Sequence, residues 1–251
     1  MKPEIITAII AAIVAVISAS ISIYGQTRVA QLADRLAKQR ETGSREAQTA
    51  ALMSKYRDPL LRSTIDLQSR LFNIHQQSFL QYAFQRSPSD KDYAIQNTLY
   101  VIAEYLGWVE ILRREVQFLD LGDLETNRHL SELLVNINQA FGSSRYGDIF
   151  RLYNGEQRAI GEIMLVSRST DNSRGYECMG YATFVKKMSD PEFARWFTQL
   201  RDNLELTVSK PKVDEERLIL IHSRLIDLID FLDPHCVRIS PRHRTRIEKG
   251  Q

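Results

Sequence analysis

Three aspartates near the C-terminal end of the chain could together bind a cation. Asp227, Asp230 and Asp233 stand three residues apart, so in a helix they lie along one edge. Converging carboxylates are typical ligands of a divalent cation, and they also bind cationic partners. The residues between them are apolar and would form the buried face of the same helix, so the alternative is that the aspartates face solvent.

A second charged group, made up of Glu110, Arg113, Arg114 and Glu115, interrupts the longest apolar stripe of the soluble part. At one-turn spacing the Glu110 carboxylate can pair with either arginine. If this helix is central, its charges need partners on the preceding helix, because an unpaired buried charge is costly. The candidate partners are Arg57, Asp58, Arg62 and Asp66. The pattern predicts a structural ion-pair network or, as the functional alternative, a charged cleft that forms an enzyme site with the three aspartates.

The remaining polar residues form no catalytic, metal or nucleotide motif. The histidines lack a second ligand at helical spacing, and the pair His235-Cys236 lacks the further ligands of a zinc site. No nucleophile-elbow pattern is present, and the central glycines do not form a phosphate-binding loop. We therefore expect no metal and no cofactor, and we favour a binding role over an enzymatic one.

Basic residues concentrate at the C-terminal end, at Arg238, Arg242, Arg244, Arg246 and Lys249. Beside a membrane, such a tail can bind anionic lipid at about 1 kcal/mol per basic residue. The alternative is a solvated, disordered end. The tail carries no aromatic residue and the whole chain has a net charge of only +2, which argues against nucleic acid as a partner.

The strongest signal in the chain is Ile5 to Tyr24, which contains no charged residue. At about 1.5 Å per residue, a helix of this length spans roughly 30 Å, the thickness of the hydrocarbon core. We predict a transmembrane anchor at residues 1–25, with a cleaved signal peptide as the alternative, although signal peptides have shorter apolar stretches. Basic residues are denser after the run than before it, which predicts an outside N-terminus and a cytoplasmic soluble domain.

Small residues recur every four positions within this run, at Ala11, Ala15 and Ala19. Such spacing lets two membrane helices approach closely, and a short apolar seam follows at Val29, Leu32 and Leu36. The pattern indicates a homodimer through the transmembrane helix. The alternative is that alanine is merely common in membrane helices.

The elements that carry all these residues are predicted to be helical. Residues 26–55 are polar and rich in alanine, which predicts a helical stalk with a break at residues 42–44, Thr-Gly-Ser. The soluble domain opens where Asp58 can cap a helix and Pro59 suits its first position. Apolar residues at helical spacing then continue to about Phe84.

The soluble domain, residues 56–235, shows further helical patterns and no convincing strand. The longest stripe runs from about Lys91 to Leu119 and is the candidate central helix. Further helices are expected at about 124–141, 156–166, 181–188, 191–200 and 218–232. The starts of three of them are marked by Asp123, by the Asp190-Pro191 pair and by Asp214. Residues 167–177 are predicted to be a polar loop. The sequence thus predicts an all-α fold: a transmembrane helix, a stalk, a bundle of about six to seven helices, and a basic tail at residues 236–251.

Cysteine usage and composition fit a cytoplasmic globular domain. The chain is 43% hydrophobic and 25% charged, an ordinary balance. Cys178 and Cys236 are far apart and belong to no CxxC pair, so we expect reduced thiols. A disulfide between them stays open if the predicted topology is wrong.

Four segments are recognisable together: Tyr56 to Ile74, Trp108 to Asp123, Gly155 to Met164, and Leu228 to Pro234. They resemble an uncharacterised family of bacterial single-pass membrane proteins with a helical soluble domain. The resemblance implies a shared helical fold and supplies no activity or site residue. We therefore expect a membrane-anchored scaffold or regulatory module that binds an unidentified protein. The alternatives are a membrane-tethered enzyme and a protein that binds anionic lipid through its tail.

Overall fold

The computed structural model describes residues 3–116, 124–170, 173–209 and 215–247. Within these ranges the side chains of residues 3–17, 19–21 and 45–54 lie outside the description, as do those of a few residues beside the gaps. The chain forms two compact units, Met1–Ala51 and Leu52–Gln251. The second unit contains the candidate site residues of the soluble domain.

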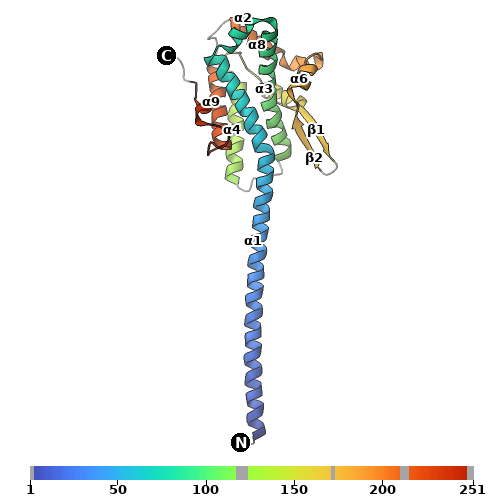
Figure 1. The fold of residues 1–251 in the computed structure, drawn as a ribbon, viewed down its shortest axis with the longest axis vertical. Helices are drawn as coiled ribbons and strands as arrows, with labels where there is room; N and C mark the ends of the chain where they lie inside the picture. The colour runs from blue at the N-terminus through green and yellow to red at the C-terminus, as the bar shows by residue number, and fades with distance from the viewer. Residues whose placement is uncertain (1–2, 117–123, 171–172, 210–214, 248–251) are drawn as a thin grey trace. The chain divides into compact units, whose positions relative to one another are not determined.

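The first helix, α1, runs without interruption from Pro3 to Gln76 (Figure 1). The predicted break at residues 42–44 is therefore wrong. A glycine inside a helix costs only about 1 kcal/mol relative to alanine, which the helix-favouring residues on both sides offset. The Thr42 hydroxyl also donates to the Lys38 carbonyl at 3.0 Å, within the helix.

The predicted helix start at Asp58 and Pro59 is also wrong, because Pro59 lies inside α1. Proline removes one helical hydrogen bond and crowds the preceding turn. Tertiary contacts hold this turn in place: the Tyr56 hydroxyl donates to Glu115, and Arg238 donates to Asp58 at 2.6 Å. Asp58 is thus an ion-pair partner and not a helix cap.

The helix predicted to reach Phe84 is divided into two. After α1 ends at Gln76, α2 spans Phe79–Arg86. Ser78 between them has a φ of 49° and turns the chain. This value lies in the left-handed region, which is sterically unfavourable for residues other than glycine. Apolar residues keep their helical spacing on both sides of Ser78, so the hydrophobic pattern gave no sign of the turn.

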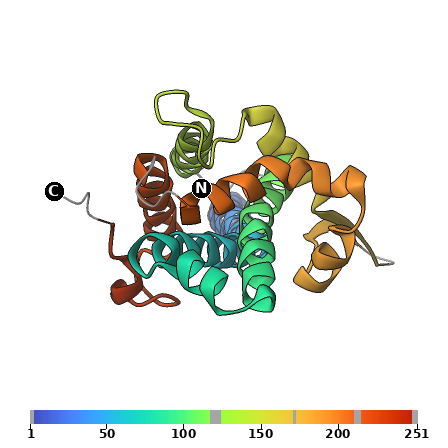
Figure 2. The ribbon, with the colours of Figure 1, turned by 90° about the horizontal axis from the view of Figure 1, so that it is seen from above.

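The second unit is built around α3, Pro88–Val116, which is the predicted central helix. It packs on α5, Asn154–Ile163, and on α2 and the hairpin described below, while α4, Leu124–Gly142, packs on α9, Glu215–Leu232. In Figures 1 and 2, α9 and α3 lie on different sides of the bundle. Their apolar stripes form one core with the second half of α1.

One part of the bundle is not helical. Strands β1, Leu165–Thr170, and β2, Ser173–Cys178, form an antiparallel hairpin in which Leu165 pairs with Cys178. The predicted polar loop at residues 167–177 is therefore wrong. This stretch lacks alternating apolar residues, and its pairing is supported by long-range contacts of β2 with α3.

The segment after the hairpin agrees with the sequence analysis. It contains α6, Tyr181–Lys187, then α7, Pro191–Ala194, a 3-10 turn at Arg195–Phe197, and α8, Thr198–Ser209. Asp190 caps α7 by accepting from the Glu192 backbone N–H at 3.0 Å. The predicted caps at Asp123 and Asp214 lie outside the described residues.

The predicted all-α bundle is confirmed in its main features, with the hairpin as an addition. Helices are more numerous than predicted because the chain turns at Ser78 and again between α7 and α8. In the part of the chain open to this test, no helix is long and apolar enough to cross a bilayer. Most side chains of the predicted anchor, residues 1–25, lie outside the described residues.

Candidate functional site

Glu110 lies where α3 crosses α5, and only 3% of its surface is exposed. The crossing is close because Gly161 on α5 faces α3. A Cβ atom at Gly161 would lie 2.8 Å from the Leu106 carbonyl oxygen and 2.9 Å from the Glu110 Cβ. The glycine therefore positions the helix that covers Glu110.

The Glu110 carboxylate is bound by both predicted partners on its own helix. Arg113 donates to its two oxygens at 2.8 and 2.6 Å, and Arg114 donates to one of them at 2.6 Å. Arg114 also contacts Glu162 of α5 at 3.1 Å. The partners expected on the preceding helix, Arg57, Asp58, Arg62 and Asp66, all lie in α1. None of them makes a described contact with Glu110, because α1 meets α3 through other residues.

Two opposing effects set the protonation of Glu110. Burial raises its pKa, but the hydrogen bonds and charges of Arg113 and Arg114 outweigh burial and lower the pKa below its ordinary value. The carboxylate is thus ionised at neutral pH with both oxygens occupied. This arrangement suits a structural clamp between helices and leaves no obvious oxygen for taking a proton from a substrate.

A cavity of about 280 Å³ adjoins this cluster between α3, α4 and α5. Glu110 and Arg113 line it together with apolar side chains and with Asn138, Gln157 and Arg158. Gln157 is committed to the fold, because its amide donates to the carbonyls of Asn138 and Leu152 at 3.0 and 2.8 Å. The predicted charged cleft therefore has a physical counterpart, and an enzymatic role for it stays a prediction.

One turn further along α3, Glu115 joins three elements. Its carboxylate accepts hydrogen bonds from the Tyr56 hydroxyl, from Lys55 at 3.3 Å and from the Tyr176 backbone N–H at 2.6 Å. Burial raises its pKa, but these hydrogen bonds and the Lys55 charge together lower it. Glu115 thus ties α1 and the hairpin to α3. Sequence analysis placed it in the charge group without giving it this role.

The three predicted aspartates do not face solvent as a set and do not converge on one point; Asp227 and Asp230 lie in α9, and Asp233 follows directly after it. Asp233 is 98% buried, with 2% of its surface exposed, whereas Asp227 is half-buried and Asp230 is exposed. Their partners come from the C-terminal segment, residues 234–247, which folds back along α9. Arg244 contacts Asp230 at 2.9 Å and Asp233 at 2.7 Å, and Arg246 contacts Asp227 at 2.8 Å.

Asp233 organises the start of this segment. Its two oxygens accept the backbone N–H groups of Val237, Arg238 and Ile239 at 2.9, 3.2 and 3.0 Å. Burial raises its pKa, but these three hydrogen bonds and the Arg244 charge lower it overall. Asp233 is therefore a buried, ionised anchor for the turn after α9.

The predicted lipid-binding arginines have unequal surroundings. Three of them form ion pairs: Arg244 with Asp230 and Asp233, Arg246 with Asp227, and Arg238 with Asp58. Arg242 is exposed, and no ion pair is found for its guanidinium within the described residues. Lys249 lies outside them. The segment is folded over residues 241–244 as a short 3-10 helix, and Ile247 is buried.

The two halves of the predicted enzyme site lie apart. Glu110, Arg113 and Arg114 are on α3 beside α5. Asp227 and Asp230 are on α9, Asp233 follows that helix directly, and all three contact the C-terminal segment. No hydrogen bond or ion pair in the described ranges joins the two sets, and α3 and α9 lie on different sides of the bundle (Figure 2). Each set is neutralised locally.

The predicted self-association residues cannot be placed by their side chains, since Ala11, Ala15 and Ala19 lie outside the described ones. The seam that follows is described and exposed: Val29, Leu32 and Leu36 are 68%, 59% and 45% exposed. Self-association stays a prediction.

His222 is the one histidine that is fully buried among those described. Its Nε2 lies 2.9 Å from the amide nitrogen of Gln68, which is also buried. Burial, assisted by the nearby charges of His75 and Arg246, lowers the pKa of His222 to about 4. The described residues include no group of three or more potential metal ligands. Both cysteines are unpaired thiols.

Arg217 is a central residue that sequence analysis missed. Its side chain is completely buried and donates to five backbone carbonyls, those of Ala140, Phe141, Ser143, Tyr146 and Gly147, at 2.6 to 3.0 Å. A cation here satisfies the last carbonyls of α4 and complements the helix dipole. The signal was present, because Arg217 precedes Ile221 and Leu225 by four and eight residues on the apolar face.

Comparison of the chain with protein-family models, with curated proteins and with solved structures gives no match. The resemblance to bacterial single-pass membrane proteins therefore stays a prediction.

Proposed function

We propose that this protein is a single-pass membrane protein whose helical unit, Leu52–Gln251, is a cytoplasmic binding module that acts as a scaffold or regulator. The observation that carries the proposal is the uncharged run Ile5–Tyr24, which belongs to the uninterrupted helix α1. A helix satisfies its own backbone hydrogen bonds, so an apolar helix of this length is stable in hydrocarbon.

The residues at the end of this run support the same proposal. Arg28 donates to the Tyr24 hydroxyl at 2.8 Å, and its guanidinium lies 5.4 Å from the centre of the Tyr24 ring. Tyrosine and arginine together are typical of the headgroup region, where an apolar ring and a charged tip can both be accommodated. This pair would mark the cytoplasmic boundary of the membrane span.

The anchor can be tested by charging the middle of the run. The variant Ile13→Arg/Val16→Arg is compared with the matched control Ile13→Leu/Val16→Leu, and membranes are washed at alkaline pH. Each central arginine disfavours insertion by about 2.5 to 3.5 kcal/mol, so the arginine variant should leave the membrane fraction while the wild type and the control remain. Release of the wild type by the wash would refute the anchor.

Orientation needs a thiol that reagents can reach. Cys178 is largely buried, and burial, with a smaller contribution from the charge of Glu104, raises its pKa to about 12, so it is a poor target. The exposed Ser89 is a better position. With Ser89→Cys in a Cys236→Ser background, a membrane-impermeant maleimide should label the protein only after the cells are permeabilised. Labelling in intact cells would place the unit outside the cytoplasm.

Self-association through α1 is the second part of the proposal. The exposed seam of Val29, Leu32 and Leu36 has the a/d spacing of paired helices. Leu32→Cys should cross-link to a dimer in isolated membranes under mild oxidation, whereas Asp34→Cys, on the opposite side of the helix, should not. Equal cross-linking at both positions would indicate random collision.

A further inference from the structure

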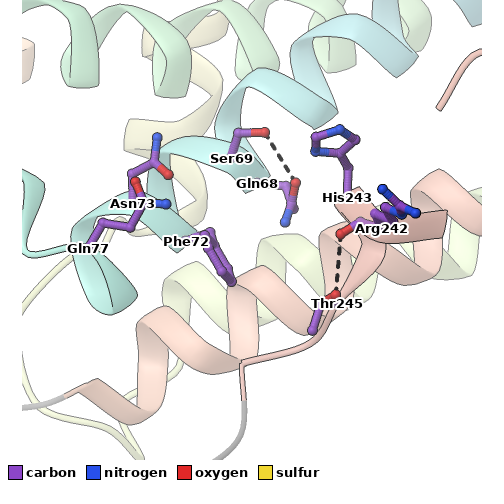
Figure 3. A pocket seen from close by; sticks show the side chains of 8 residues that line it. All are labelled: Gln68, Ser69, Phe72, Asn73, Gln77, Arg242, His243 and Thr245. Carbon is purple, nitrogen blue, oxygen red and sulfur yellow. Dashed lines mark hydrogen bonds between the residues drawn. The ribbon is translucent and has the colours of Figure 1, made fainter. Parts of the chain in front are cut away.

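A cavity of about 320 Å³ lies between the second half of α1 and the C-terminal segment (Figure 3). This volume is at the lower end of the range for small-molecule sites, about 300 to 1,000 Å³. All of its lining residues belong to the unit Leu52–Gln251. The cavity is separate from both charge clusters predicted from the sequence.

The lining combines hydrogen-bonding groups, one aromatic ring and positive charge. On one side, α1 contributes Gln68, Phe72 and Asn73, and Gln77 follows directly after the helix. On the other side, the C-terminal segment contributes Arg242 and His243 (Figure 3). No aspartate or glutamate is found among the described lining residues. A lining with amide and guanidinium donors and no carboxylate favours the binding of an anion.

Arg242 differs from the other arginines of the segment. Arg238, Arg244 and Arg246 each form an ion pair with an aspartate, so their charges are compensated. For the Arg242 guanidinium no ion pair or hydrogen bond occurs within the described residues, and its carbonyl is held by the Thr245 hydroxyl at 3.3 Å. The backbone is therefore fixed while the charged group remains available to a ligand.

The α1 side of the cavity is pre-organised. Gln68, with only 3% of its surface exposed, is fixed by His222 at 2.9 Å and by the Ser69 hydroxyl at 3.3 Å. Phe72 is held beside the His222 ring, with 6.1 Å between the ring centres. Fixed groups reduce the entropy lost when a ligand binds.

We propose that this cavity binds a small organic oxyanion, a phosphoryl or carboxyl compound whose charged group meets Arg242 and whose apolar part contacts Phe72. The guanidinium fork matches the oxygens of either group. The inference goes beyond the membrane anchor and does not depend on it, because no lining residue comes from residues 1–51.

The test is a calorimetric titration of the full chain in neutral detergent with phenyl phosphate, with benzoate and with uncharged phenol. We expect one phenyl phosphate or benzoate per chain and no saturable phenol binding. Arg242→Gln should weaken anion binding about tenfold or more, as expected for the loss of a charge-assisted hydrogen bond. Arg201→Gln, which removes an exposed arginine of α8, should leave the affinity unchanged.

Phe72→Leu supplies a second, independent readout. It should weaken binding of phenyl phosphate while leaving that of inorganic phosphate unchanged, because only the former has a ring. The absence of saturable binding of either organic anion at millimolar concentration would overturn the proposal. An equal effect of Arg242→Gln and Arg201→Gln would also overturn it, since general electrostatic attraction would then suffice.

The oxyanion could be soluble or belong to a lipid headgroup, and a final arm distinguishes the two. The phenyl phosphate titration is repeated in nanodiscs of phosphatidylcholine with and without phosphatidylglycerol. If phosphatidylglycerol weakens the binding of phenyl phosphate, and Arg242→Gln removes this effect of the lipid, the result would support the proposed site and identify a headgroup as its ligand. Equal affinity in both nanodiscs would support the cavity with a soluble ligand.

Discussion

Replacing Gly161 by alanine should push α5 away from α3 at the point where Glu110 is buried. The added methyl group would lie 2.8 Å from the Leu106 carbonyl oxygen and 2.9 Å from the Glu110 Cβ. Neither atom can rotate away, because one belongs to the backbone of α3 and the other is attached directly to it. Relief requires the two helices to separate.

The magnitude follows from two opposing effects. Overpacking of this kind costs about 1 to 3 kcal/mol, whereas alanine gains about 1 kcal/mol over glycine within a helix. The free energy of unfolding should therefore fall by up to about 2 kcal/mol. Gly155, in the first turn of the same helix, has no atom within 4 Å of an added Cβ. Gly155→Ala is thus a matched control that should leave stability unchanged or raise it by up to about 1 kcal/mol.

The assay is urea unfolding of the full chain in non-denaturing detergent, followed by the fluorescence of Trp108 and Trp196. The midpoint should decrease for Gly161→Ala at an unchanged slope, because the surface exposed on unfolding is the same. Equal midpoints for the two variants would refute the reasoning. They would show that this glycine does not set the distance between α3 and α5.

Two further predictions concern the buried guanidinium of Arg217 and the buried imidazole of His222. Arg217→Met should lower the free energy of unfolding by about 3 kcal/mol or more, because five carbonyls each lose a hydrogen bond from this side chain. Arg224 is an exposed ion-pair residue of the same helix, and Arg224→Met should cost less than about 1 kcal/mol in the same urea assay. The pKa of His222 is lowered to about 4 in the folded state, so the unfolded state binds a proton at a higher pH than the folded state does. The contribution of His222 to the free energy of unfolding should therefore be complete above about pH 6.5. Between pH 6.5 and pH 4 it should fall by up to about 1.4 kcal/mol per pH unit. His222→Gln should flatten this part of the pH profile, and an unchanged profile would contradict the assignment.

Apolar spacing predicted the helices because each buries one face in a common core. Helix α3 follows its stripe from Ile95 to Leu112, and the Asp190-Pro191 pair correctly marked the start of α7. These signals are local: a cap or a stripe is complete within one element. That is why the fold class could be predicted from the sequence.

The features that failed depend on residues distant in sequence. Pro59 looked like a helix start because the contacts that hold its turn within α1 cannot be seen locally: Tyr56 contacts Glu115, and Asp58 contacts Arg238. The hairpin lacks an alternating pattern, and its backbone donates to Glu115 from 61 residues away. Propensity and periodicity do not contain this information.

The candidate site shows the same division. The internal pairing of Glu110 with Arg113 and Arg114 was predictable from one-turn spacing. The pairing of Asp227, Asp230 and Asp233 with the arginines of the C-terminal segment was not proposed. Its signal was an acidic group followed within 19 residues by a basic one. The cavity at Phe72 and Arg242 joins residues about 170 positions apart and had no sequence signature.

The five carbonyls bound by Arg217 also bear on the order in which the chain folds. They precede Arg217 by 70 to 77 residues, so the end of α4 and the turn that follows it must wait for α9 before these five hydrogen bonds can form. Closing so long a loop is entropically slow. Amide hydrogens at the end of α4 and at the start of α9 should therefore become protected from exchange together during refolding, after those in the middle of α3.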